Sequence, residues 1–124
     1  MNKDELLQRT KEFGLRVLKL VRALPKDVAG RALANQLVRS GTAVGANYRA
    51  ACRARSKAEF RAKLGIVLEE ADESAFWLEL IMEDGMLAKS RIEHLRAEAD
   101  ELCAIFYRSI DSLPRQRLTP NAKS

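Results

Sequence analysis

Apolar residues recur at alternating steps of three and four positions through four successive segments of this 124-residue chain. This spacing places them along one face of an α-helix, whereas a half-buried strand would alternate at every second position. Each segment keeps a seven-residue repeat over about three heptads, which favours nearly parallel packing of helices in a left-handed bundle. The sequence therefore predicts an all-α protein.

Signals at the segment ends place the first two helices. The first is expected over residues 3–24, because Pro25 follows and a helix rarely continues into proline. The second is expected over residues 27–54. Its apolar stripe consists of Leu33, Leu37, Ser40, Val44, Asn47 and Ala51.

Capping signals place the other two helices. Ser56 and Glu59 have the spacing of a capping box, in which each side chain bonds the backbone amide of the other residue, and Gly85 is a natural end for the third helix. Ser90 and Glu93 repeat that spacing, so we expect a second capping box at the start of the fourth helix.

The fourth helix is expected to end before Pro114, which leaves four helices of similar length joined by short connections. Short connections favour antiparallel neighbours, so the prediction is an antiparallel up-down-up-down four-helix bundle. Residues 1–113 would form this single domain. Residues 114–124 are polar and carry three cations, and we expect them to form a flexible basic C-terminal tail.

The composition is that of a compact soluble protein, with 47% hydrophobic residues, 31% charged residues and a net charge of +5. The N-terminus is charged from its third residue, and no apolar run approaches the roughly 20 residues that span a bilayer. We therefore expect a cytoplasmic protein with no membrane contact. Cys52 and Cys103 are expected to be reduced thiols packed on helices.

The charge of the chain reverses sharply near its middle. Residues 49–63 have a local charge of +5, with one anion, Glu59, and six cations: Arg49, Arg53, Arg55, Lys57, Arg61 and Lys63. Residues 64–84 contain seven acids and no lysine or arginine. A boundary of this kind bears on partners and self-assembly.

Two hypotheses give the basic segment a function. In the first, its six cations contact the phosphates of RNA or DNA, which gives affinity with little reading of base sequence. In the second, the basic segment meets an acidic protein surface, namely the third helix of the next subunit, and sets the orientation of a homo-oligomer. The alternative without a partner is a solvated cationic face.

Gly41 and Gly45 lie four residues apart and therefore share a face of the second helix. Glycine inside a helix costs about 1 kcal/mol relative to alanine, so these two positions need an offsetting contact. Close approach of another subunit and close packing within one chain both provide such a contact. The sequence leaves both interpretations open.

Polar residues interrupt the stripe of the second helix at Ser40 and Asn47. Because a buried amide needs hydrogen-bond partners, we expect Asn47 to bond a neighbouring helix and fix its register, and a ligand site is the alternative. Trp77 adjoins Phe76 in sequence. Their rings are expected to point in different directions, with one of them at a subunit contact.

The residue patterns of catalytic and metal sites are missing from the sequence. His94 is the only histidine, there is no Cys-x-x-Cys pair, and no Glu-x-x-His pair supports a di-iron site. A catalytic triad and a glycine-rich phosphate loop are also missing. We therefore expect a non-enzymatic protein with no catalytic residue, no cofactor and no metal.

Three stretches, RSGTAVGANYRAA, SKAEF and KLGIVLEEADESAFWLELI, together resemble the 23S ribosomal-RNA intervening-sequence proteins, a family of four-helix bundles. The resemblance extends over most of the chain, from about residue 13 to about residue 110. The residues that carry it are Gln36, Arg39, Ser40, Ala46, Asn47, Ser56, Phe60, Leu64, Glu70, Glu73 and Leu78.

The resemblance implies a ring-like homopentamer with a role in nucleic-acid binding. A related branch resembles the accessory proteins of diversity-generating retroelements, which are basic pentamers that bind nucleic acid and a reverse transcriptase. Members of the family usually carry an acid at the position that Ala50 occupies here. A contact made by that acid in the family is therefore not implied for this chain.

Overall fold

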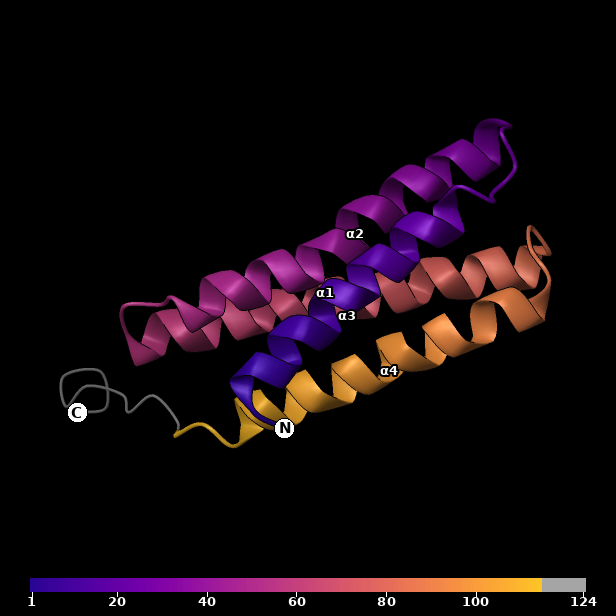
Figure 1. Ribbon diagram of the computed structural model, residues 1–124. Coiled ribbons are helices and arrows are strands. Elements are labelled where there is room, and N and C mark those ends of the chain that lie inside the picture. The colour runs from indigo at the N-terminus through magenta and orange to yellow at the C-terminus, as the bar shows by residue number, and fades with distance from the viewer. Residues whose placement is uncertain (115–124) are drawn as a thin grey trace, which may run out of the picture.

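The computed structural model describes residues 1–114 and shows four α-helices in that range. These are α1 (Lys3–Val21), α2 (Val28–Cys52), α3 (Lys57–Asp84) and α4 (Lys89–Asp111). The chain direction reverses at each of the three short connections, so consecutive helices run antiparallel (Figure 1). Since the described residues also contain no strand, the predicted all-α four-helix fold is confirmed.

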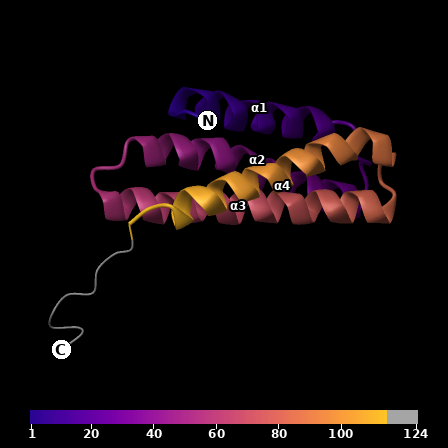
Figure 2. The ribbon, with the colours of Figure 1, turned by 90° about the horizontal axis from the view of Figure 1, so that it is seen from below.

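Consecutive helices make most of the interhelical contacts. The pairs α1–α2, α2–α3 and α3–α4 pack extensively, whereas α1 and α4 contact each other much less. Figure 2 shows α4 crossing obliquely over α3. The core lies between the four helices, and its largest fully buried side chains are Phe13, Phe106, Leu37, Leu64, Leu78, Ile81, Ile92 and Leu102. All four predicted stripes contribute to this core.

Side chains cap the first three helices. Asn2 and Glu5 form a capping box at α1, with the Glu5 amide donating to Asn2 Oδ1 over 2.8 Å. The Asp27 carboxylate accepts from the backbone of α2. Ser56 accepts from the Glu59 amide over 3.0 Å, as predicted. The Glu59 carboxylate, however, accepts from the amide of Arg55, so only half of the predicted box forms.

The predicted capping box of the fourth helix is wrong. The helix begins at Lys89 with Ala88 as its N-cap, and no side chain bonds the cap. Ser90 therefore lies inside the first turn, where its hydroxyl is misplaced for capping. The cause is the tight end of α3: Gly85 adopts a left-handed conformation (φ 78°), and Met86 and Leu87 immediately pack on the core. Four residues, 85–88, therefore suffice to connect α3 to α4.

Three helices end two or three residues earlier than predicted, at Val21, Cys52 and Asp111. The residues that follow form tighter turns, in which an amide bonds the carbonyl three positions back. Examples are the bonds from the Leu24 amide to Val21 and from the Ala54 amide to Ala51. The apolar spacing of the sequence continues through such a turn, so it predicted helix ends that lie beyond the observed ones. Of the predicted tail, residues 115–124 lie outside the described part of the chain.

Gly41 and Gly45 both face α1 of the same chain. A Cβ atom added to Gly41 would lie 2.7 Å from Val17 Cγ2. A Cβ atom added to Gly45 would lie 3.2 Å from the backbone oxygen of Thr10. The close approach expected from the sequence therefore occurs within the monomer, where α1 lies almost directly on the backbone of α2.

None of the helices in residues 1–114 is long and apolar enough to cross a membrane.

Candidate nucleic-acid interface

The six cations of the basic segment surround the connection between α2 and α3, at the left of Figure 1. The four that come first in the chain are exposed: Arg49, Arg53, Arg55 and Lys57. Arg61 and Lys63 are half-buried, and Arg61 donates to the Pro114 carbonyl over 3.4 Å. The structure thus separates the predicted set into an exposed group of four and two cations that lie against the fold.

The first half of α1 and the last half of α2 enclose a groove of about 560 Å³. Its charged lining consists of Lys3, Asp4 and Lys11 from α1, Arg49 from α2 and Arg53, the C-cap residue of α2. Its wall also includes Gly45 and Ala46. Because these residues have little or no side chain, the groove stays open beside a tightly packed helix pair.

A second groove, of about 410 Å³, lies at the α2–α3 connection. It is lined by Lys3, Arg55 and Lys57 together with the rings of Tyr48 and Phe60. Lys3 also lines the first groove, so the two grooves adjoin. We call this surface the basic end and define it by its six cations: Lys3, Lys11, Arg49, Arg53, Arg55 and Lys57.

Sequence reasoning missed the contribution of α1 to this surface. Lys3 and Lys11 lie far from the basic segment in sequence, and α1 has no excess of positive charge in its first half. The sequence signal for this contribution was the Gly41–Gly45 pair. Close packing of α1 on these glycines brings Lys3 and Lys11 into the same groove as Arg49. The partner helix of those glycines was unknown from the sequence alone.

Other arginines bond carboxylates on a neighbouring helix. Arg9 on α1 lies 2.7 Å from Glu98 and 2.9 Å from Glu101 on α4, and these contacts lower the pKa of Glu101 through hydrogen bonding and charge. Arg96 on α4 pairs with Glu79 on α3 at 3.6 Å. Within residues 1–114, by contrast, no cation of the basic end lies within 4 Å of a carboxylate oxygen.

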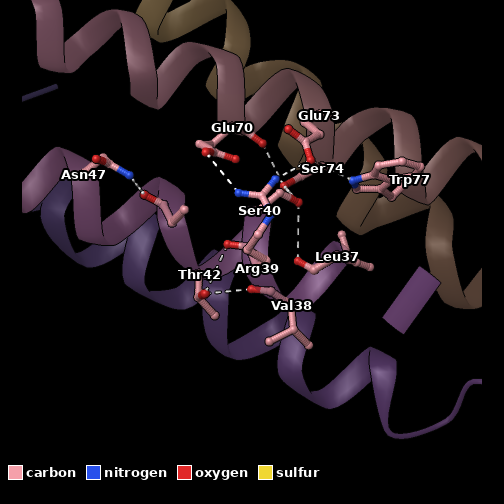
Figure 3. Close-up of polar contacts among 11 residues, drawn as sticks. Leu37, Val38, Arg39, Ser40, Thr42, Asn47, Glu70, Glu73, Ser74 and Trp77 are labelled. Atoms are coloured by element: carbon pink, nitrogen blue, oxygen red, sulfur yellow. Dashed lines mark hydrogen bonds and ion pairs between the residues drawn. The ribbon is translucent and has the colours of Figure 1, made fainter. Parts of the chain in front are cut away.

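A polar cluster joins α2 to α3 at mid-length (Figure 3). Arg39 bonds both Glu70, at 3.3 Å, and Glu73. The Glu73 carboxylate also accepts from Trp77 Nε1 over 3.2 Å. Beneath this exposed layer the hydroxyl groups of Ser40 and Ser74 are fully buried and lie 2.9 Å apart. The cluster therefore fixes the register of α2 against α3.

The predicted role of Asn47 is corrected by this arrangement. Asn47 Nδ2 donates to the Ala43 carbonyl of its own helix over 2.9 Å, so the predicted bond to a neighbouring helix is not made (Figure 3). The reason is position: Asn47 is half-buried, whereas Ser40 is fully buried and directly faces Ser74. The buried interhelical bond belongs to the serine pair.

Phe76 and Trp77 contact each other, with ring centroids 5.3 Å apart. Glu73 holds the half-buried Trp77 ring, whereas Phe76 is 51% exposed. The two rings were expected to point in different directions, but they remain in contact. Phe76 is the ring that faces outward.

The acids of α3 are only partly neutralised within the chain. Arg39 pairs with Glu70 and Glu73, and Arg96 pairs with Glu79. Of the seven acids in residues 64–84, the other four are exposed and have no ion pair in the described part of the chain: Glu69, Asp72, Glu83 and Asp84.

Residues 1–114 contain no group of three or more His, Cys, Asp or Glu side chains arranged to hold a metal ion. Cys52 and Cys103 are unpaired and half-buried. Burial, reinforced by Asp72 and Asp100, raises the pKa of the Cys103 thiol to about 11. This thiol is therefore protonated near neutral pH and is a poor nucleophile.

The family model of the 23S rRNA-intervening sequence protein matches residues 2–108. The chain belongs to this family. A crystal structure of a protein of unknown function from the S23 ribosomal protein family of Bacteroides thetaiotaomicron is also similar, with 31% sequence identity and a TM-score of 0.80. The similarity covers 86% of this chain and 99% of that one. No functionally curated protein matches the chain.

The resemblance to the 23S rRNA-intervening sequence proteins is thereby confirmed. Four residues that carried it lie in the polar cluster between α2 and α3: Arg39, Ser40, Glu70 and Glu73. The contacts of these four residues join α2 to α3, so this part of the family resemblance reflects helix packing. The cations of the basic end lie outside this cluster.

Proposed function

We propose that this protein is a non-enzymatic nucleic-acid-binding protein that holds phosphates at the basic end. The observation that carries the proposal is the clustering of six cations around two adjoining grooves, with no carboxylate partner in residues 1–114. Cations without partners gain most from a polyanion, because binding releases the counterions of the nucleic acid. RNA is the first ligand to test, given the name of the family.

The chemistry of the basic end favours backbone contacts over base reading. Arginine and lysine bind phosphate oxygens, which positions a strand but carries no sequence information. Tyr48 is 6% exposed and packs on Phe106, with ring centroids 5.4 Å apart, so its ring is held in the core and offers little surface for base stacking. Binding should therefore depend strongly on salt and weakly on sequence.

We further propose that the protein works as a homopentamer, as the resemblance implies. A ring would repeat the basic end five times around one axis. Several weak patches joined in one assembly bind a long strand much more tightly than a single patch, provided that the strand reaches several of them together.

The variant R53Q/R55Q/K57Q tests the proposal. We expect its affinity for an RNA oligonucleotide of about 16 nucleotides to fall about tenfold or more. The dependence of log K on log salt should become shallower by about 2, because up to three phosphate contacts are lost. Fluorescence anisotropy between about 50 and 200 mM salt measures both quantities.

A matched control removes the same charge from the far end of the bundle. Arg22, Lys26 and Arg31 are exposed near the α1–α2 connection, so R22Q/K26Q/R31Q has the same net charge as the test variant. Equal losses in the two variants would show that only net charge matters. No binding by the unmodified protein at low salt, with its assembly intact, would refute the proposal.

A second candidate function is a self-assembling scaffold, favoured by the four exposed, unpaired acids in residues 64–84 of α3. Here the basic end of one subunit contacts the acidic face of the next. The variant R53E/R55E/K57E should then dissociate the assembly, and adding E69K/D72K/E83K should restore it by reversing both surfaces. Light scattering after size-exclusion chromatography measures the mass. An assembly whose mass is unchanged by the first variant would eliminate this candidate.

A further inference from the structure

A third groove, of about 430 Å³, lies between α1 and α4 and takes no part in the basic end. Its lining consists of Arg16, Lys19 and Leu20 from α1 and Arg91, His94 and Leu95 from α4. The two leucines are buried, and the other four lining residues are basic, two from each helix. We call it the α1–α4 groove.

The antiparallel register of α1 and α4 allows the residues of this groove to be compared with an ion-paired contact between the same two helices. Arg9 on α1 bonds Glu98 and Glu101 on α4. Two turns further along α1, the equivalent of Arg9 is Arg16. Two turns back along α4, the equivalents of the two glutamates are Arg91 and His94. The register therefore places Arg16 opposite Arg91 and His94, whereas Arg9 lies opposite Glu98 and Glu101.

In the described part of the chain, no carboxylate pairs with the three cations of this groove. Within residues 1–114, Arg16, Lys19 and Arg91 have no carboxylate oxygen within 4 Å. Glu12, one turn before Arg16, instead accepts a hydrogen bond from Gln8 over 3.0 Å. Like charges across a groove repel each other, and a bound anion removes that repulsion.

We propose that the α1–α4 groove is a second phosphate-binding site, occupied by the backbone of the same RNA that binds the basic end. The inference rests on the proposed function. Helix α1 connects the two sites, because Lys11 lines the first and Arg16 the second. Five residues of helix separate these cations by about 7.5 Å along the axis and by about 140° around it. One strand crossing α1 contacts both sites.

The test uses His94, which is the only histidine of the chain and lies in the α1–α4 groove. In the full-length protein labelled with ¹³C-histidine, the imidazole resonance reports this groove alone. We expect titration with a uridine oligonucleotide of about 16 nucleotides to shift the resonance at low salt. Raising the salt to about 200 mM should reverse the shift.

The variant R16Q/K19Q/R91Q completes the test. We expect it to reduce the salt slope of RNA binding by about 2, whereas R22Q/K26Q/R31Q leaves the slope nearly unchanged. Circular dichroism of both variants checks that the helices are intact. RNA binding by anisotropy without any shift of the His94 resonance would overturn this inference and leave the basic end in place. Failure of RNA to bind at all would overturn both.

Discussion

Replacing Gly30 by alanine is expected to destabilise the protein by about 3 kcal/mol or more, the largest single effect we predict. Gly30 lies in the first turn of α2, beneath the connection from α1. An added Cβ would overlap the Pro25 carbonyl oxygen and lie 2.8 Å from its carbonyl carbon. Both obstacles are backbone atoms, so no side-chain rotation relieves them. Urea unfolding monitored by circular dichroism measures the loss.

Gly65 provides a matched control, because it lies inside α3 with nothing within 4 Å of an added methyl group. The same substitution there should stabilise the protein by about 0.5–1 kcal/mol, which is the helix propensity that alanine gains over glycine. If the two substitutions change the free energy of unfolding in the same direction, backbone overlap at Gly30 is not the deciding effect.

Replacing Gly41 by alanine is expected to cost about 1–3 kcal/mol. The added methyl group would lie 2.7 and 2.9 Å from the two γ-carbons of Val17. Valine is stiff about χ1, and this one is fully buried, so α1 has to move away from α2. The same urea titration measures the change.

Val17 gives this prediction a stringent check. V17A alone should destabilise the protein by leaving a cavity, but V17A makes room for the methyl group of G41A. We expect the double variant to lose less stability than the sum of the single ones, with a coupling of at least about 0.5 kcal/mol. Additive losses would mean that Gly41 is needed for a contact other than the one with Val17.

The fold was predictable from the sequence because its signals were redundant. The apolar stripes, Pro25 and Gly85 all indicated four helices, and the structure buries most of those stripes. The predicted start of the fourth helix depended on one signal and was wrong. The spacing of Ser90 and Glu93 matches a capping box, but the position of Ser90 depends on how Met86 and Leu87 pack after α3.

The candidate site was predictable only in the part that is contiguous in sequence. Arg53, Arg55 and Lys57 follow one another along the chain, so composition was sufficient to find them. Lys3 and Lys11 join them through packing of α1 on α2, which a single sequence does not specify. Asn47 was predicted to be a buried amide from its place on the apolar stripe. Its actual exposure depends on where the neighbouring helix lies, which the sequence does not specify.

The weak contact between α1 and α4 also bears on how the molecule folds and moves. Because most packing joins helices that are consecutive in sequence, each helix can dock as soon as the previous one is in place, and such local topology favours fast folding. α1 and α4 each have only one extensive neighbour, so their local unfolding costs less than separating α2 from α3. Since α1 forms a wall of both the first groove of the basic end and the α1–α4 groove, each local opening of α1 changes the two grooves together.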